Sequence, residues 1–367
     1  MRRVVFFFVV TILSLSFFLL NRSKAVPEKT SSRLEKTVKR NEKIIVPSEM
    51  GAFLFVPYWS LKPDSILRLP DITEKEKLNT IIYFGIAANE SGINTQEAGY
   101  NNLETFRAVT ADFQQNTLLS LRLTDEHLNE KILSSQDLQD SAISQTLEIS
   151  RKYSFDGIVV DLEHSVLPTQ ETVTSITNFL SRFATHAHQQ NQSFAVTIYG
   201  DTLYRQRPYD LKAIGEFSDV ILVMSYDFHK SYGEPGPNFP LYQGKSYPYS
   251  LEKMLKSFSS QIDPSKMVIL FGLYGYDWAV DDQNRPLTSA KALTFNQIKA
   301  KFIESCPASK CIADRDETSG ESHISYSESS GQKHVLWYED PSSISTKIKE
   351  VQSFGIDKIG YWAYGYY

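Results

Sequence analysis

The stretch that decides the fold is Phe155–Glu163, with the sequence FDGIVVDLE. It combines an apolar centre rich in β-branched residues with acids at its end. Near-continuous apolar runs of this length are typical of parallel strands that are covered on both faces. Seven further runs of the same kind flank it, so the chain carries eight in all: Ala52–Trp59, Asn79–Ala87, Asn116–Leu123, Phe155–Glu163, Phe194–Gly200, Asp219–Asp227, Met267–Tyr276 and Asp357–Gly365.

Amphipathic stretches of helical length separate most of these runs. Eight alternating strand and helix units predict an α/β fold of the (β/α)8 type, a TIM barrel. An open doubly wound sheet is the alternative, but its nucleotide-binding forms carry a GxGxxG turn that this sequence lacks. We therefore expect the barrel. The clearest helical stretches are Asn102–Gln115, Leu138–Tyr153, Glu171–Gln190, Ser250–Ile262 and Ser342–Phe354.

The interval between the seventh and eighth runs is much longer than the others. It contains a helical piece, Thr294–Ile303, and two strand-like pieces, His323–Ser327 and His334–Tyr338. We predict an α+β insertion after strand 7, at about residues 279–340, inside one domain that spans residues 51–367.

The N-terminus has the pattern of an export segment. Met1–Arg3 is basic, Val4–Leu20 is apolar and uncharged, and Ser23-Lys24-Ala25 has small residues at the spacing that signal peptidase requires. Residues 1–25 are therefore either a signal peptide that is cleaved after Ala25 or an uncleaved membrane anchor. Residues 26–50 are predicted to be a polar linker. Both alternatives place the domain outside the cytoplasm, secreted or tethered to the membrane through Val4–Leu20.

Composition excludes several classes of function. There are 38 Lys+Arg against 43 Asp+Glu, a net charge of −5, which argues against a nucleic-acid partner. Only two cysteines, Cys306 and Cys311, are present, so a disulfide framework or a thiolate-rich metal site is excluded. In an exported chain these two form either a local disulfide or a pair of free thiols. We expect the domain to act as a monomer.

Two acids end the fourth apolar run. Strand alternation puts Asp161 and Glu163 on the same face as Val159, while the intervening residues are uniformly apolar and suit the helix-facing side. Both acids are thus predicted to point into the mouth of the barrel, where such folds carry their chemistry. Two adjacent carboxyl groups do not both ionise freely, so one holds a proton near neutrality. We expect Glu163, nearer the rim, to be the proton donor; the alternative is a salt-bridged structural pair.

Other polar and aromatic residues fall at strand ends. His164 follows the acids but lies on the opposite face, and no second histidine has ligand spacing, so we expect no metal site. A pyranose ring offers an apolar face with polar edges. Aromatic side chains around the barrel mouth are therefore expected to form sugar-stacking platforms. The candidate substrate-binding side chains at these strand ends are Tyr58, Trp59, Met224, Tyr226, Asp227, Tyr274, Trp278 and Trp362.

These motifs resemble glycoside hydrolase family 18, the chitinase-like barrels. The segment DGIVVDLE resembles the family's DGxDxDxE signature, MSYD resembles its MxYD motif, and the GYW around Trp362 is similar to its eighth-strand tryptophan. The resemblance runs in order from Gly51 to Tyr367. Segments such as GLYGYDW resemble the bacterial spore-cortex and germination branch.

The resemblance implies a role for each matched residue. Glu163 would be the general acid/base, Asp161 and Tyr226 would hold the substrate's acetamido group, Asp227 would assist them, and Trp362 would form the floor under the sugar. It also implies substrate-assisted retention without metal or cofactor. The substrate would be a β-linked N-acetylglucosamine polymer, of the chitin or the peptidoglycan type.

One position departs from the signature. Val159 stands where the family has an acid, or asparagine in some germination-type members. Valine cannot hydrogen-bond, so Asp161 loses a partner, and we expect activity to be reduced rather than abolished. The alternative is a catalytically silent barrel that binds N-acetylated glycans as a lectin.

Overall fold

The computed structural model describes residues 50–62, 78–307 and 310–367. The expected signal peptide or anchor, and the expected linker apart from Met50, lie outside the described residues. Within the described ranges, no helix combines the length and the hydropathy that a membrane crossing requires.

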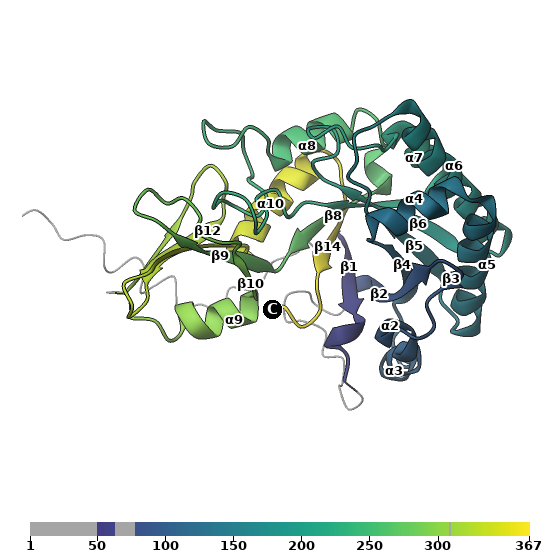
Figure 1. The fold of residues 1–367 in the computed structure, drawn as a ribbon, viewed down its shortest axis with the longest axis horizontal. Helices are drawn as coiled ribbons and strands as arrows, with labels where there is room; N and C mark the ends of the chain where they lie inside the picture. The colour runs from purple at the N-terminus through teal and green to yellow at the C-terminus, as the bar shows by residue number, and fades with distance from the viewer. Residues whose placement is uncertain (1–49, 63–77, 308–309) are drawn as a thin grey trace, which may run out of the picture. The chain divides into compact units, whose positions relative to one another are not determined.

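Eight parallel strands form the predicted barrel. Each pairs with the next in chain order, and β1 pairs with both β14 and β2, which closes the sheet. The (β/α)8 prediction is therefore confirmed (Figure 1). The barrel strands are β1 (Gly51–Pro57), β2 (Leu78–Asn89), β4 (Asn116–Leu123), β5 (Gly157–Leu162), β6 (Ser193–Tyr199), β7 (Val220–Met224), β8 (Met267–Gly272) and β14 (Lys358–Trp362).

Helices follow the strands where the sequence pattern predicted them, and their ends are set by local capping. The Ser135 side chain accepts a hydrogen bond from the backbone of Leu138 at the start of one helix. Asp340 and Ser343 form a capping box at the start of another, with Pro341 at its first position. The helices are α2 (Ala98–Asn101), α3 (Leu103–Thr110), α4 (Glu126–Ser134), α5 (Gln136–Lys152), α6 (Gln170–Gln189), α7 (Leu211–Phe217), α8 (Leu251–Phe258) and α10 (Pro341–Ser353).

The two faces of the barrel strands have separate cores. Val159 packs inside the barrel with Phe55, Leu118 and Ala195. The alternate residues of β5 instead join the larger core between the strands and the helices, among them Ile158, Val160 and Leu162. This division confirms the predicted alternation and directs the acids of β5 into the barrel.

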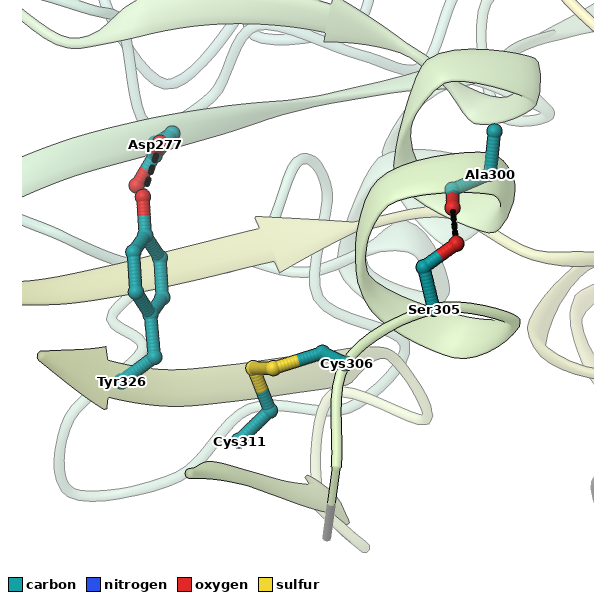
Figure 2. The surroundings of a disulfide bond; sticks show 6 residues. All are labelled: Asp277, Ala300, Ser305, Cys306, Cys311 and Tyr326. Carbon is teal, nitrogen blue, oxygen red and sulfur yellow. Dashed lines mark hydrogen bonds between the residues drawn. A yellow bond between two sulfur atoms is a disulfide. The ribbon is translucent and has the colours of Figure 1, made fainter. Parts of the chain in front are cut away.

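The insertion is a second, antiparallel sheet of five strands in the order β10-β9-β13-β12-β11. A short helix, α9 (Phe295–Ile298), and one π-turn lie between its strands. A disulfide joins Cys306 to Cys311, so the first of the two alternatives for these cysteines holds in the structure (Figure 2). The strands are β9 (Tyr274–Val280), β10 (Lys291–Thr294), β11 (Cys311–Arg315), β12 (Ser322–Ser327) and β13 (Lys333–Tyr338).

The boundary between barrel and insertion differs from the prediction. The single run expected over Met267–Tyr276 is divided, because β8 ends at Gly272 and β9, which begins at Tyr274, belongs to the insertion. Gly275 permits the change of sheet, since a Cβ there would lie 2.2 Å from the backbone oxygen of Trp337 on β13. Both segments are extended and apolar, so the sequence pattern does not mark the point where pairing partners change.

Candidate active site

A pocket of about 150 Å³ opens at the carboxyl ends of the barrel strands. It brings together seven residues that the sequence analysis singled out and adds three that it did not, Phe55, Phe84 and Thr197. The seven come from four separate strands or strand ends and are Asp161, Glu163, Met224, Tyr226, Asp227, Tyr274 and Trp362.

Strand β6 places a hydroxyl group beside each acid of β5. Thr197 Oγ1 donates a hydrogen bond to Asp161 Oδ1. The Tyr199 hydroxyl donates to Glu163 Oε2 at 2.8 Å. The parallel register explains both contacts, because β5 and β6 pair residue for residue and expose alternate side chains to the barrel interior.

Asp161 is the more buried of the two acids, at 3% exposure. Burial, followed by the negative charge of Glu163, raises the pKa of Asp161 to about 7, against the opposing effects of the Thr197 hydrogen bond and the Arg122 charge. Asp161 therefore binds the proton of the pair strongly in the unliganded protein, whereas we expected from the sequence that Glu163 would hold it.

A second polar cluster surrounds Asp227, just beyond β7. Its carboxylate accepts hydrogen bonds from the hydroxyls of Tyr276, at 2.8 Å, and Tyr274. Its backbone has a positive φ of 58° and its N–H donates to Asn238 Oδ1 at 2.7 Å, which holds this left-handed turn. Burial raises the pKa values of Tyr226 and Tyr274, so both hydroxyls stay protonated and can act as donors.

The loop that carries Asn238 is fixed by a buried charged cluster. Glu321 of the insertion accepts the backbone N–H of Phe239 at 2.7 Å. Lys347 of α10 donates to Glu321 at 2.6 Å and to Glu339 at 2.8 Å, and all three charged side chains are at most 1% exposed. The insertion therefore supports the Asp227 end of the pocket, a role that nothing in the sequence pattern indicated.

Aromatic rings form one wall of the pocket. The ring of Trp362 lies 4.7 Å from that of Phe84 and 5.5 Å from that of Phe55, centroid to centroid. Trp59 lies 6.2 Å from Trp362 and is 47% exposed, so the aromatic surface continues outward. The Trp362–Ala363 peptide bond is cis.

Two expected sugar platforms lie elsewhere. Tyr58 does not line the pocket; its ring lies 5.0 Å from the guanidinium carbon of Arg122. Trp278 is fully buried in the insertion, where its indole N–H donates to the backbone oxygen of Gly233. For Trp278 the expectation of a sugar platform is wrong, because β9 turns away from the barrel mouth.

Metal-binding geometry is not found in the part of the chain that the structure describes, where no three His, Cys, Asp or Glu side chains gather closely enough to hold an ion. His164 is buried outside the pocket, and this burial lowers its pKa.

Sequence reasoning missed Thr197 and Tyr199. The segment FAVTIYG carries a signal that could have found them, since Thr197 and Tyr199 stand two residues apart on one strand face, as Asp161 and Glu163 do. Only the relative register of the two strands makes them partners, and that register comes from the closed sheet.

The chain is similar in sequence to several known proteins. The chain is 25% identical over 302 residues to the cortical fragment-lytic enzyme of Bacillus anthracis, covering 78% of this chain and 65% of that protein. It is 26% identical over 246 residues to the uncharacterized glycosylase YvbX of Bacillus subtilis, covering 66% of each. The chain thus spans about two thirds of the length of these relatives.

Solved structures show the same fold. The Bacillus cereus spore cortex-lytic enzyme SleL superposes with a TM-score of 0.66 at 22% identity, over 87% of this chain and 71% of that one. The family model of glycosyl hydrolases family 18 matches residues 53–366, which is nearly the whole described domain. This chain belongs to glycosyl hydrolase family 18.

Proposed function

We propose that the protein is an exported glycosidase that cleaves β-linked glycans containing N-acetylglucosamine, of the chitin or the peptidoglycan type. One observation carries the proposal: two neighbouring acids, Asp161 and Glu163, line the same pocket as the aromatic ring of Trp362. Membership of family 18 and the similarity to cortical fragment-lytic enzymes support the substrate class.

The pocket suits a substrate-assisted retaining mechanism. The substrate's own acetamido oxygen attacks the anomeric carbon while Glu163 protonates the leaving oxygen. Asp161 gives up its share of the proton and lies as an anion beside the positively charged oxazolinium-like intermediate, which it stabilises in a site with little water. Glu163 then removes a proton from the water that opens the intermediate. The anomeric configuration is retained because it is inverted twice.

The remaining pocket residues hold the sugar. The Tyr226 hydroxyl, kept protonated by burial, can donate to the acetamido carbonyl oxygen. Asp227 lies within the same pocket and is already oriented by Tyr274 and Tyr276. Met224 and Trp362 contribute apolar surface against the ring face. This arrangement favours recognition by hydrogen bonds and stacking.

Export is part of the proposal and is supported by the basic Met1–Arg3 followed by the apolar Val4–Leu20. Cell fractionation and N-terminal sequencing of the mature protein test it. A mature chain that starts after Ala25 would identify a signal peptide, a membrane-bound full-length chain would identify an anchor, and a cytoplasmic chain would contradict export.

The activity is tested by incubating the full-length chain with N-acetylglucosamine oligomers and, in parallel, with purified peptidoglycan. We expect hydrolysis of at least one substrate by the wild type and none by Glu163→Gln, with binding retained in the variant. Hydrolysis that survives Glu163→Gln would refute the assignment of the proton donor. The product pattern identifies the polymer and distinguishes endo from exo cleavage.

One observation favours a second candidate, a lectin that binds N-acetylated glycans without cleaving them. Val159 is fully buried beneath Asp161 and offers it no hydrogen bond. Binding without cleavage, by both the wild type and Glu163→Gln, would decide for the lectin. The retained Glu163 and Tyr226 oppose it.

A further inference from the structure

Tyr199 holds one oxygen of the acid that we propose as proton donor. Its hydroxyl donates to Glu163 Oε2 at 2.8 Å. Among the described residues this is the only hydrogen bond to the Glu163 carboxyl group, whose other oxygen, Oε1, keeps its full capacity for a ligand. The two oxygens of Glu163 are therefore not equivalent before any substrate arrives.

The ring of Tyr199 is itself held in place by Arg207, which packs against it. The guanidinium carbon of Arg207 lies 3.8 Å from the ring centroid. Arg207 in turn makes two hydrogen bonds to the Asp201 carboxylate, of 2.6 and 3.1 Å, and both side chains are almost completely buried. Paired donors of this kind fix the orientation of a guanidinium group. The Tyr199 hydroxyl is thereby aimed at Glu163 by groups that do not touch the pocket.

We infer that Tyr199 is a positioning residue that anchors Oε2 of Glu163, so that Oε1 alone transfers the proton in both halves of the reaction. The inference rests on the proposed function. A carboxyl group that must act first as acid and then as base toward atoms in fixed positions loses efficiency when its two oxygens exchange by rotation. A hydrogen bond to one oxygen prevents that exchange.

The chemistry of the contact fits this role. Burial and the negative charge of Glu163 raise the pKa of Tyr199, so its hydroxyl remains a donor throughout the working range of pH. Tyr199 donates a hydrogen bond to Glu163, whereas Val159 has no polar atom with which to bind either acid. Other titratable or charged groups around the acid pair stay unchanged when Tyr199 is replaced; they are Tyr209, Tyr226, Asp227, Arg122 and Arg207.

The first test is the pH profile of Tyr199→Phe, in the full-length chain, on a soluble N-acetylglucosamine oligomer. We expect kcat to fall about 10- to 100-fold, the cost of a small misplacement of a catalytic group, while KM changes by less than about threefold. The alkaline limb of kcat/KM should move to higher pH, because the fully ionised acid pair loses a donor that stabilises it. A fall in kcat with an unmoved limb would mean that Tyr199 only fills space, and would overturn the inference.

Tyr361→Phe is the matched control. Tyr361 is a buried tyrosine on β14 whose hydroxyl has no hydrogen-bond partner among the described residues. It lies in the core between strands and helices, outside the pocket. Loss of its hydroxyl should leave both kcat and the pH profile at the wild-type values.

A double-mutant cycle tests the contact without relying on hydrolysis. We expect the effects of Tyr199→Phe and Glu163→Ala on the melting temperature at pH 7 to be non-additive by about 2 °C or more. The same cycle with Tyr361→Phe should be additive. Additive effects for Tyr199 would overturn the inference even if the enzyme is active. If the wild type hydrolyses no glycan, the proposed function fails while the cycle still decides whether Tyr199 holds Glu163.

Discussion

Replacement of Val159 by asparagine should make the enzyme faster, most of all in mild acid. Val159 lies in register between Ser120 of β4 and Ala195 of β6, and the Ser120 hydroxyl beside it has no hydrogen-bond partner within the described residues. An asparagine there can accept from Ser120 and donate to Asp161. Asparagine is preferred to aspartate for this test because it adds no third carboxyl group to the pair.

The expected gain follows from the titration of Asp161. Below pH 7 the pair holds one proton, and burial keeps much of it on Asp161, whose pKa is about 7. A new donor favours the ionised form of Asp161, so the proton lies more often on Glu163, which must donate it. One hydrogen bond of about 0.5–1.5 kcal/mol shifts that balance about 2- to 10-fold, and we expect kcat/KM below pH 7 to rise by the same factor. Because the donor also lowers the pKa at which the pair loses its proton, the alkaline limb of the profile should move to lower pH.

The same change has a modest effect on stability. The fully buried Val159 side chain contributes about 1.5–3 kcal/mol. Two new hydrogen bonds return about 0.5–1.5 kcal/mol each. The two contributions nearly cancel, so the free energy of unfolding should fall by less than about 1 kcal/mol and the melting temperature by less than about 4 °C. Val159→Ala is the control, since it removes the apolar side chain without adding a donor, and it should lose stability and gain no activity.

Initial rates on a soluble oligomer from pH 5 to 8, together with melting temperatures, measure both effects. A folded Val159→Asn variant with an unchanged alkaline limb would refute the reasoning, because Asp161 would then not control the proton of the pair. Slower turnover at every pH would refute the expectation that Val159 reduces activity.

Three further outcomes are expected. Lys347→Met leaves Glu321 and Glu339 buried without their cation, so the free energy of unfolding should fall by about 3–5 kcal/mol, measured by urea denaturation; a loss below 1 kcal/mol would contradict this. Cys306→Ser with Cys311→Ser opens a loop of only a few residues and should cost about 2 kcal/mol, with kcat unchanged because neither cysteine lines the pocket. Asp161 has a higher pKa in the folded protein than its unfolded value of about 3.9, so stability should fall as pH rises from about 4 to 7. Melting temperatures of Asp161→Asn should lack this contribution to the slope.

The barrel could be predicted because its signal is local. Each strand is a short apolar run. Side chains alternate from residue to residue along β5, so Ile158, Val160 and Leu162 face the helices. Val159 and Asp161 face the inside of the barrel. The strand ends then indicate where polar side chains gather, and most of the expected pocket residues do line one pocket. Periodicity of two along the chain suffices for that prediction.

The change of sheet after Gly272 could not be predicted in the same way. The Leu273 N–H donates to the backbone oxygen of Trp362 in the barrel, whereas Tyr274 pairs with β10 and Gly275 with β13 of the insertion. Because both segments are extended and apolar, periodicity is the same on each side of the boundary. The expected sugar platform at Trp278 was wrong for this reason.

The partners of the two acids depend on a different kind of information, the register between β5 and β6. A sequence comparison with the family signature identifies Val159 as a loss, since it removes a hydrogen-bonding group beneath Asp161. The structure shows that Asp161 and Glu163 nevertheless each have a donor, from Thr197 and Tyr199. A hydroxyl group can donate to a carboxylate, but it cannot share a proton as the signature's acid at position 159 would. Thr197 and Tyr199 therefore preserve the orientation of the two acids but do not replace that acid as a proton carrier. Hence we expect a site that is correctly oriented, but in which the shared proton lies too often on Asp161 and too seldom on Glu163 below about pH 7.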